Sequence, residues 1–138
     1  MMEYVFRQRE KDGHQEVFDP IRKKWLVLTP EERVRQQLIL FLLNVKKIPS
    51  SHISVERAIT VNGLKKRYDL VVFSPEGNPW MVVECKAPEV AITQAVVEQA
   101  GRYNKTLRAP ILGVTNGSAH FFFTIDFETE EIRPLTDF

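Results

Sequence analysis

Apolar residues along the chain fall into short runs that predict β-strands and into two helical stripes. Residues 67–74 and 79–86 are rich in Val, Phe, Tyr, Trp and Met, a composition typical of strands. Between them lies Pro75-Glu76-Gly77-Asn78, which disfavours both strand and helix and therefore predicts a hairpin turn. The other predicted strands are short ones within residues 4–28, then Ile53–Val61, Ile111–Thr115, residues 120–125 and an edge strand around Ile132. Further turns are predicted at Lys11-Asp12-Gly13, Asp19-Pro20, Asn62-Gly63 and Asn116-Gly117.

Two helices are predicted from apolar residues that recur at helical spacing. The first begins after Thr29 as N-cap, with Pro30 at the first helical position and Glu32 completing a capping box. Its buried stripe is predicted to consist of Val34, Leu38, Phe41, Leu42 and Val45. The second helix is predicted to begin at Pro88 and to run for roughly twenty residues. Its sheet-facing stripe is predicted to be Ile92, Val96, Gln99, Tyr103 and Leu107.

The hairpin of residues 65–88 brings charged residues together. If its loop closes symmetrically, facing residue numbers sum to about 153, so Asp69 lies opposite Glu84 and Arg67 opposite Lys86. Because side chains alternate between the two faces of a strand, Asp69, Glu84 and Lys86 share one surface. The other surface is predicted to be a core face made of Tyr68, Leu70, Val72, Met81, Val83 and Cys85. Cys85 is therefore expected to be a packed core thiol rather than a nucleophile.

Two facing carboxylates at the end of an apolar sheet repel each other. They persist only if a cation or a shared proton lies between them. Oxygen ligands favour hard ions such as Mg²⁺, Mn²⁺ or Ca²⁺, and a lysine two residues after the second acid can offset charge on a phosphate or on an attacking water. The alternative is a structural salt-bridge cluster in which Arg67 and Lys86 balance Asp69 and Glu84.

The spacing of these residues resembles a known nuclease pattern. The pattern is similar to the motif of the PD-(D/E)xK nuclease superfamily: Asp69, fourteen intervening residues, and then Glu84-Cys85-Lys86. Arg67-Tyr68-Asp69 followed by Val83-Glu84-Cys85-Lys86-Ala87-Pro88 resembles the nuclease domain at the N-terminus of type I restriction enzyme R subunits. Tyr68 replaces the proline that precedes the aspartate in the superfamily pattern.

The resemblance implies an α+β fold, an α/β sandwich with a restriction-endonuclease-like core. Its order is αβββαβ, with a mixed central sheet flanked by helices. A single domain is expected, with an N-terminal strand extension (1–28), the core (29–117) and C-terminal hairpin or edge strands (118–138). The implied function is Mg²⁺-dependent hydrolysis of DNA phosphodiester bonds, with Mn²⁺ as a substitute. The implied catalytic residues are Asp69, Glu84 and Lys86.

The resemblance also implies a ligand set and a DNA-positioning set. The metal ligands would be Asp69, Glu84, the backbone carbonyl of Cys85, and a glutamate of the first helix, for which Glu31 is favoured over Glu32. Gln99 and Tyr103 resemble a Gln-x-x-x-Tyr motif that follows the lysine in several nuclease branches. With Arg67 and Arg102, they are expected to position DNA. Equally, Gln99 and Tyr103 could serve only to satisfy each other at the edge of the core.

Composition and charge limit the function classes. The net charge of +1 gives no strong overall field, so any DNA contact must come from a local basic patch. The single cysteine excludes an internal disulfide framework and a Cys-rich zinc site. No basic and apolar leader opens the sequence, and the longest apolar run, residues 38–43, is too short to cross a membrane. We therefore expect a soluble, cytoplasmic protein.

The partners follow from the implied function. The sequence contains no Gly-x-x-x-x-Gly-Lys-Ser/Thr phosphate loop, so no ATPase motor is expected within these residues. Three alternatives follow: a stand-alone nuclease, a shortened form of a longer protein, or a module that works with a separate motor or specificity subunit. Paired cuts in duplex DNA would need two active sites, which makes a homodimer an expectation as well. The alternative function is a catalytically silent nuclease-fold module that binds DNA or a partner protein.

Overall fold

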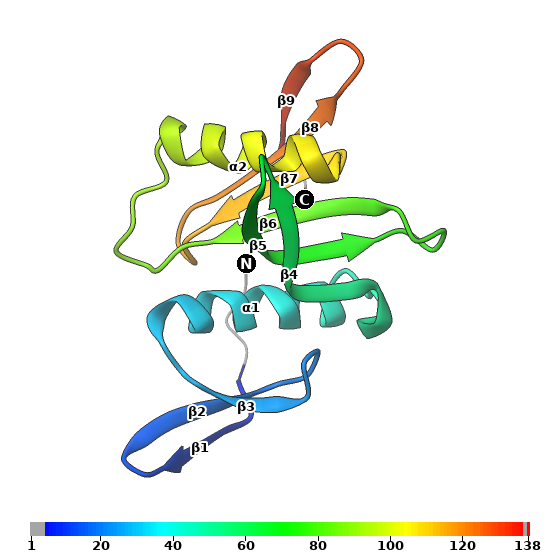
Figure 1. Ribbon diagram of the computed structural model, residues 1–138. Helices are drawn as coiled ribbons and strands as arrows, with labels where there is room; N and C mark the ends of the chain where they lie inside the picture. The colour runs from blue at the N-terminus through cyan, green and yellow to red at the C-terminus, as the bar shows by residue number, and fades with distance from the viewer. Residues whose placement is uncertain (1–4, 137) are drawn as a thin grey trace.

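The described residues, 5–136 and 138, form two sheets and two α-helices in the computed structural model (Figure 1). The larger sheet has six strands in the order β4-β5-β6-β7-β8-β9. Their bounds are Ile53–Val61, Leu64–Phe73, Pro79–Cys85, Ile111–Thr115, His120–Asp126 and Glu131–Leu135. β6 and β7 pair in parallel, and the other neighbours pair antiparallel. The sheet is therefore mixed, as predicted.

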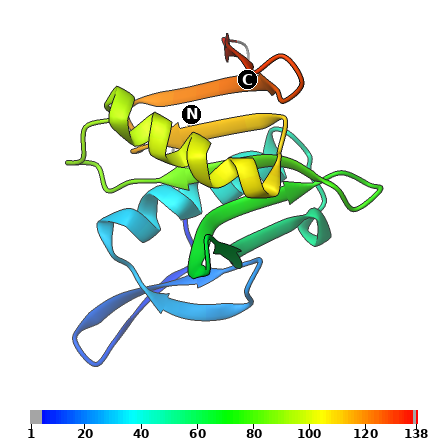
Figure 2. The same cartoon turned by 45° about the horizontal axis from the view of Figure 1, so that its top comes forward.

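The two helices, α1 (Pro30–Asn44) and α2 (Gln94–Leu107), lie on opposite faces of the larger sheet (Figures 1 and 2). Side chains alternate along β6, so Met81 and Val83 belong to the core on the α1 side, and Val82 belongs to the core on the α2 side. Because β6 is buried on both faces, it reads as a nearly continuous apolar run. α2 also provides the crossover that two parallel neighbours require.

A separate three-stranded sheet lies on the far side of α1 from the larger sheet (Figures 1 and 2). Its antiparallel strands are β1 (Gln8–Lys11), β2 (His14–Asp19) and β3 (Lys24–Val27). The predicted turn at Asp12 and Gly13 is present, and both residues have positive φ (52° and 77°). A short 3-10 helix, Ser50–His52, leads into β4. No helix of the described residues is long and apolar enough to cross a membrane.

The predicted start of the second helix was wrong. α2 begins at Gln94, and Thr93 is its N-cap, accepting a hydrogen bond from the Val96 N–H. The preceding segment is held as a loop, because the Asn116 amide donates to the Val90 carbonyl at 2.9 Å. Four of the five residues predicted to face the sheet, Ile92, Val96, Tyr103 and Leu107, do pack against the core on the α2 side. Gln99 is exposed instead, and the side chains that α2 buries most deeply, Ala100 and Asn104, were not predicted.

The first helix agrees better with the prediction. Val34, Leu38 and Leu42 are buried as expected, and Ile39 joins them. Val45 is half-exposed because α1 has already ended at Asn44. The difference is one of helix length, not of the face that packs on the sheet.

Tyr68 lies on the opposite face from the one predicted. It packs with Val71 on the α2 side, whereas Leu70 packs on the α1 side. Strict alternation is interrupted beside Glu56 of β4, which has a positive φ of 54°. β4 and β5 pair at Val55–Leu70 and again at Arg57–Tyr68, and the intervening Glu56 and Asp69 do not form a pair. The outer part of the β4–β5 hairpin bends away from the rest of these two strands (Figures 1 and 2).

Candidate functional site

Asp69 and Glu84 meet where the β5–β6 ladder ends. The observed pairs Leu70–Val83, Val71–Val82 and Val72–Met81 have the register predicted from the symmetric loop. Asp69 lies just outside this ladder, immediately before Leu70 on β5, and its Oδ2 accepts the backbone N–H of Cys85 at 2.8 Å. The two acids that the sequence pattern placed opposite each other therefore lie together, and Asp69 also contacts Arg35 of α1.

A shared proton explains part of how this acid pair is tolerated. The pKa of Glu84 is raised to about 8 by burial, by the charge of Asp69 and by a hydrogen bond with Asp69, while Lys86 partly lowers it. A carboxyl with such a pKa is largely protonated at neutral pH, so it donates to its neighbour instead of repelling it. The pair then carries roughly one negative charge instead of two.

A buried arginine supplies the positive charge next to Asp69. Arg35 of α1 donates from NH2 to Asp69 Oδ1 at 2.9 Å, from NH1 to Glu32 at 2.7 Å, and from NH2 to Glu31 at 3.3 Å. Its side chain is only 6% exposed, and the ion pairs with Glu32 and Asp69 outweigh burial and raise its pKa further. The Arg35 Nε has no hydrogen-bond partner among the described residues.

The salt-bridge alternative named the wrong cation. Arg67 pairs with Glu56 at 3.4 Å and not with Asp69. Among the described residues, no ion pair within 4.0 Å joins Lys86 to a carboxylate. Arg35 was not predicted at all, although its position three residues after Glu32 and four after Glu31 is the spacing at which helical side chains meet.

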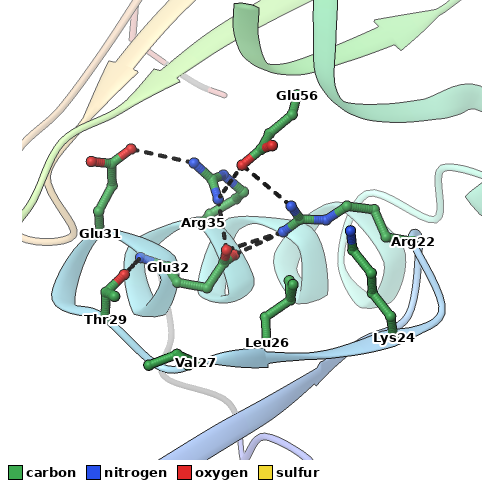
Figure 3. Close-up of a pocket in the computed structure, with 9 residues that line it drawn as sticks. All are labelled: Arg22, Lys24, Leu26, Val27, Thr29, Glu31, Glu32, Arg35 and Glu56. Atoms are coloured by element: carbon green, nitrogen blue, oxygen red, sulfur yellow. Dashed lines mark hydrogen bonds and ion pairs between the residues drawn. The ribbon is translucent and has the colours of Figure 1, made fainter.

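Arg35 belongs to a larger charge network that lines a cavity of about 370 Å³ (Figure 3). Arg22 joins this network from the turn after β2, with ion pairs to Asp19 (2.7 Å), Glu32 (3.0 Å) and Glu56 (3.3 Å). The lining residues are Arg22, Lys24, Leu26, Val27, Thr29, Glu31, Glu32, Arg35 and Glu56. The network connects the small sheet, α1 and β4 around the approach to Asp69.

The two glutamates at the start of α1 have different surroundings. Glu32 is buried and accepts from both Arg22 and Arg35, so its carboxylate does not complete the predicted capping box. Only half of that motif forms, since Thr29 Oγ1 accepts the Glu32 N–H at 3.1 Å, while the Thr29 N–H donates to the Val27 carbonyl. Glu31 is half-exposed, and burial together with the charge of Asp69 raises its pKa. Of the two, Glu31 faces the acid pair.

Lys86 and Cys85 lie at the end of β6. The Lys86 N–H donates to the Thr115 carbonyl at 2.8 Å, which fixes the backbone beside the acids. The Lys86 charge lowers the pKa of both Glu84 and Glu31, so its ammonium group lies close to the acidic cluster. The Cys85 thiol is fully buried on the α1 side, as expected, and burial raises its pKa well above the usual value.

The predicted Gln99–Tyr103 pair forms on α2, where Gln99 Nε2 donates to the Tyr103 hydroxyl at 3.2 Å. This hydrogen bond is the main cause of a lowered Tyr103 pKa. The Tyr68 hydroxyl donates to the Tyr103 carbonyl, which ties α2 to β5 one residue before Asp69. Arg102 is exposed on α2, and Arg67 is exposed on β5. Of these four residues, Tyr103 lies close enough to the acid pair for the charge of Glu84 to act on its pKa.

The donor set suits a hard divalent cation. Glu31, Asp69 and Glu84 offer carboxylate oxygens, and burial together with the charge of Asp69 raises the pKa values of Glu31 and Glu84. In the described part of the chain, however, no group of three or more His, Cys, Asp and Glu side chains has the geometry to hold a metal. Arg35 and a proton balance the charge in this arrangement.

Comparisons with known proteins point to one family. Residues 30–138 match the family described as Type I restriction enzyme R protein N terminus. A solved fragment assigned as an HsdR subunit of a type I restriction enzyme from Vibrio vulnificus YJ016 is 26% identical, with a TM-score of 0.42, over 62% of this chain. The match spans 18% of the length of that structure. A search of curated proteins found no match.

Proposed function

The chain belongs to the type I restriction enzyme R protein N-terminus family, and from that premise we propose that it is a metal-dependent nuclease acting on DNA phosphodiester bonds. The observation that supports this most is the Asp69–Glu84 pair, with Glu84 protonated near neutral pH and Lys86 close by. A structural salt bridge would not need a second acid whose pKa is raised to about 8. The PD-(D/E)xK pattern of the sequence supplies the roles that follow.

In this proposal Asp69, Glu84 and the backbone carbonyl of Cys85 hold Mg²⁺ or Mn²⁺, and Glu31 completes the set directly or through water. The ion would polarise the phosphoryl oxygen and lower the pKa of the attacking water. Lys86 orients that water or offsets the charge that develops in the transition state. The Cys85 N–H holds Asp69 in place through Oδ2, so the carboxylate needs little rearrangement.

Arg35 must be accounted for in the same proposal, because it bonds Asp69 Oδ1. Each carboxylate oxygen has two lone pairs, so Asp69 can keep Arg35 and still offer a ligand. Glu84 must lose its proton when it becomes a ligand, and the charge of the ion supplies the driving force. DNA and the other subunits of a restriction system are the proposed partners, with a homodimer for paired cuts.

A catalytically silent nuclease-fold module that binds DNA or a partner protein is the second candidate, and one observation favours it. Both oxygens of Asp69 already have donors, Arg35 and the Cys85 N–H. If those bonds never yield to a metal, the acid cluster is structural. Isothermal titration calorimetry with Mn²⁺ at neutral pH, on the native protein and on Glu84→Gln, separates the two candidates. If Glu84 is a metal ligand, the variant binds Mn²⁺ more weakly than the native protein does.

The proposal is tested by incubating the protein with supercoiled plasmid and Mg²⁺ or Mn²⁺. Lys86→Ala and an EDTA sample are the negative controls. Lys11→Ala is the matched control, since Lys11 is exposed at the end of β1, away from the acids. Nicking that disappears in EDTA and in Lys86→Ala but persists in Lys11→Ala supports the nuclease. Cleavage that survives Lys86→Ala, or no cleavage with either metal, counts against it.

A further inference from the structure

The outer half of the β4–β5 hairpin, residues 57–67, is a cationic arm. It carries four basic residues, Arg57, Lys65, Lys66 and Arg67, and no acidic residue. The whole chain has 19 basic and 18 acidic residues, so without the arm 15 basic residues face 18 acidic ones. The positive charge needed to attract a polyanion is therefore concentrated in this one hairpin, on a body that is net negative.

The cations of the arm lie on both of its faces. Lys65 and Arg67 share one face, and Arg67 there meets Glu56, which belongs to the charge network of α1. Lys66 lies on the other face, with its ammonium 5.6 Å from the centre of the Tyr103 ring of α2. Arg57 is on this second face too, where its guanidinium lies 5.0 Å from the ring centre of Phe73. Each face of the arm therefore carries two cations.

The arm is also accessible and long enough to reach into a groove. The Arg67 side chain is 72% exposed, and Leu64, next to the Asn62-Gly63 turn, is 62% exposed. At about 3.3 Å per residue, the strand from residue 57 to 62 extends roughly 17 Å. Figures 1 and 2 show this part of the hairpin bending away from the rest of β4 and β5.

We propose that the arm binds duplex DNA by entering the major groove, with the cations of its two faces contacting phosphates of the two strands. The groove is about 12 Å wide and about 8.5 Å deep, and it accommodates a two-stranded β-ribbon. A single strand lying on one face would leave half of the cations without a phosphate. This inference rests on the proposed function, because β5 continues from the arm directly to Asp69 and so brings a bound duplex to the acids.

Fluorescence anisotropy with a 25-base-pair labelled duplex in EDTA tests the arm without cleavage. The test variant is K65Q/K66Q, and the matched control is K46Q/K47Q, an adjacent lysine pair after α1. Each lost phosphate contact lowers the slope of log K against log salt by about 0.9, so the test variant should lose about two units of slope. Over a fourfold change in salt, that loss corresponds to about a tenfold difference in affinity. The control variant should keep the slope of the native protein, and circular dichroism verifies that both variants fold.

Two results would overturn the inference: an unchanged slope in K65Q/K66Q, or single-stranded DNA or duplex RNA of equal length binding as tightly as duplex DNA. Failure of the nuclease proposal looks different. If the plasmid is not cut but K65Q/K66Q still loses duplex affinity, the DNA-binding role of the arm is supported and the nuclease proposal is refuted. If K65Q/K66Q binds and cuts DNA as the native protein does, the nuclease proposal is supported and the DNA-binding role of the arm is refuted.

Discussion

Replacing Arg35 with Met removes the cation on which the acidic cluster depends. The side chains of Glu32 and Asp69, its partners at 2.7 and 2.9 Å, are only 9% and 14% exposed. Removing one member of a buried ion pair typically costs about 3–5 kcal/mol, because the remaining charge is left without a partner. The pair with Glu31, which is 48% exposed, adds at most about 1 kcal/mol. We therefore expect the free energy of unfolding to fall by about 3–5 kcal/mol at pH 7 in EDTA.

The matched control is Arg67→Met, which breaks an ion pair with Glu56 at 3.4 Å, a carboxylate that Arg35 also contacts. The Arg67 side chain is 72% exposed, so its loss should change stability by no more than about 0.5 kcal/mol. Urea unfolding followed by far-UV circular dichroism measures both variants, and an unchanged m-value shows that the comparison is of native stability. A loss below about 1 kcal/mol in Arg35→Met would refute a buried charge network.

Adding Mg²⁺ extends the test to the proposed metal site. If Arg35 competes with the ion for Asp69, Arg35→Met frees that carboxylate and should bind the ion more tightly than the native protein does. A tenfold gain in affinity appears as about 1.4 kcal/mol of additional stabilisation at saturating ion. Arg35→Lys keeps the charge and should recover part of the stability without the gain in ion affinity. Equal stabilisation of native protein and Arg35→Met by Mg²⁺ would show that Arg35 does not compete.

Three further predictions concern single contacts. The pKa of Glu84 rises from near 4.5 to about 8 on folding, so stability in EDTA should fall as pH rises from 5 to 8. Glu84→Gln should flatten that slope and exceed the native protein in stability at pH 8, which urea unfolding at several pH values checks. Gly113→Ala would place a methyl group 2.4 Å from the Phe122 ring and should cost about 1–3 kcal/mol in thermal or urea unfolding. The loss should shrink when Phe122→Leu is added. Tyr68→Phe removes a hydroxyl that donates to a backbone carbonyl of α2, so it should lower the free energy of unfolding by about 0.5–1.5 kcal/mol. A variant as stable as the native protein in urea unfolding would contradict this.

Elements governed by local chemistry were predictable from the sequence. Strand alternation and the Asn62-Gly63 pair gave the bounds of β4 and the turn after it, where both residues have positive φ (50° and 78°). The symmetric loop after β5 gave the register, and with it the meeting of Asp69 and Glu84. In each case residues close in sequence determine the result.

Features that depend on distant segments were not predictable. Pro88 suits a helix start, but Asn116 from another part of the chain holds that segment as a loop. Arg22 begins a run of three basic residues, and it is directed into the network by Asp19, which accepts both its Nε–H and its backbone N–H. The Gln36 amide donates to Asp19 Oδ2 at 2.9 Å, and this contact forms only because the fold packs β2 against α1.

One local irregularity connects the acid pair to the cationic arm. Glu56 adopts a positive φ that non-glycine residues rarely use, and the hairpin bends at this point. The bend moves Tyr68 to the α2 side, where its hydroxyl reaches the backbone of α2, and it leaves Asp69 facing Arg35 on the α1 side. The Glu56 carboxylate also contacts Arg22, Arg35 and Arg67 within 3.6 Å, so the bend is held by charges from three segments. The proposed phosphodiester site needs cations beside its acids, and β5 carries Arg67 two residues before Asp69.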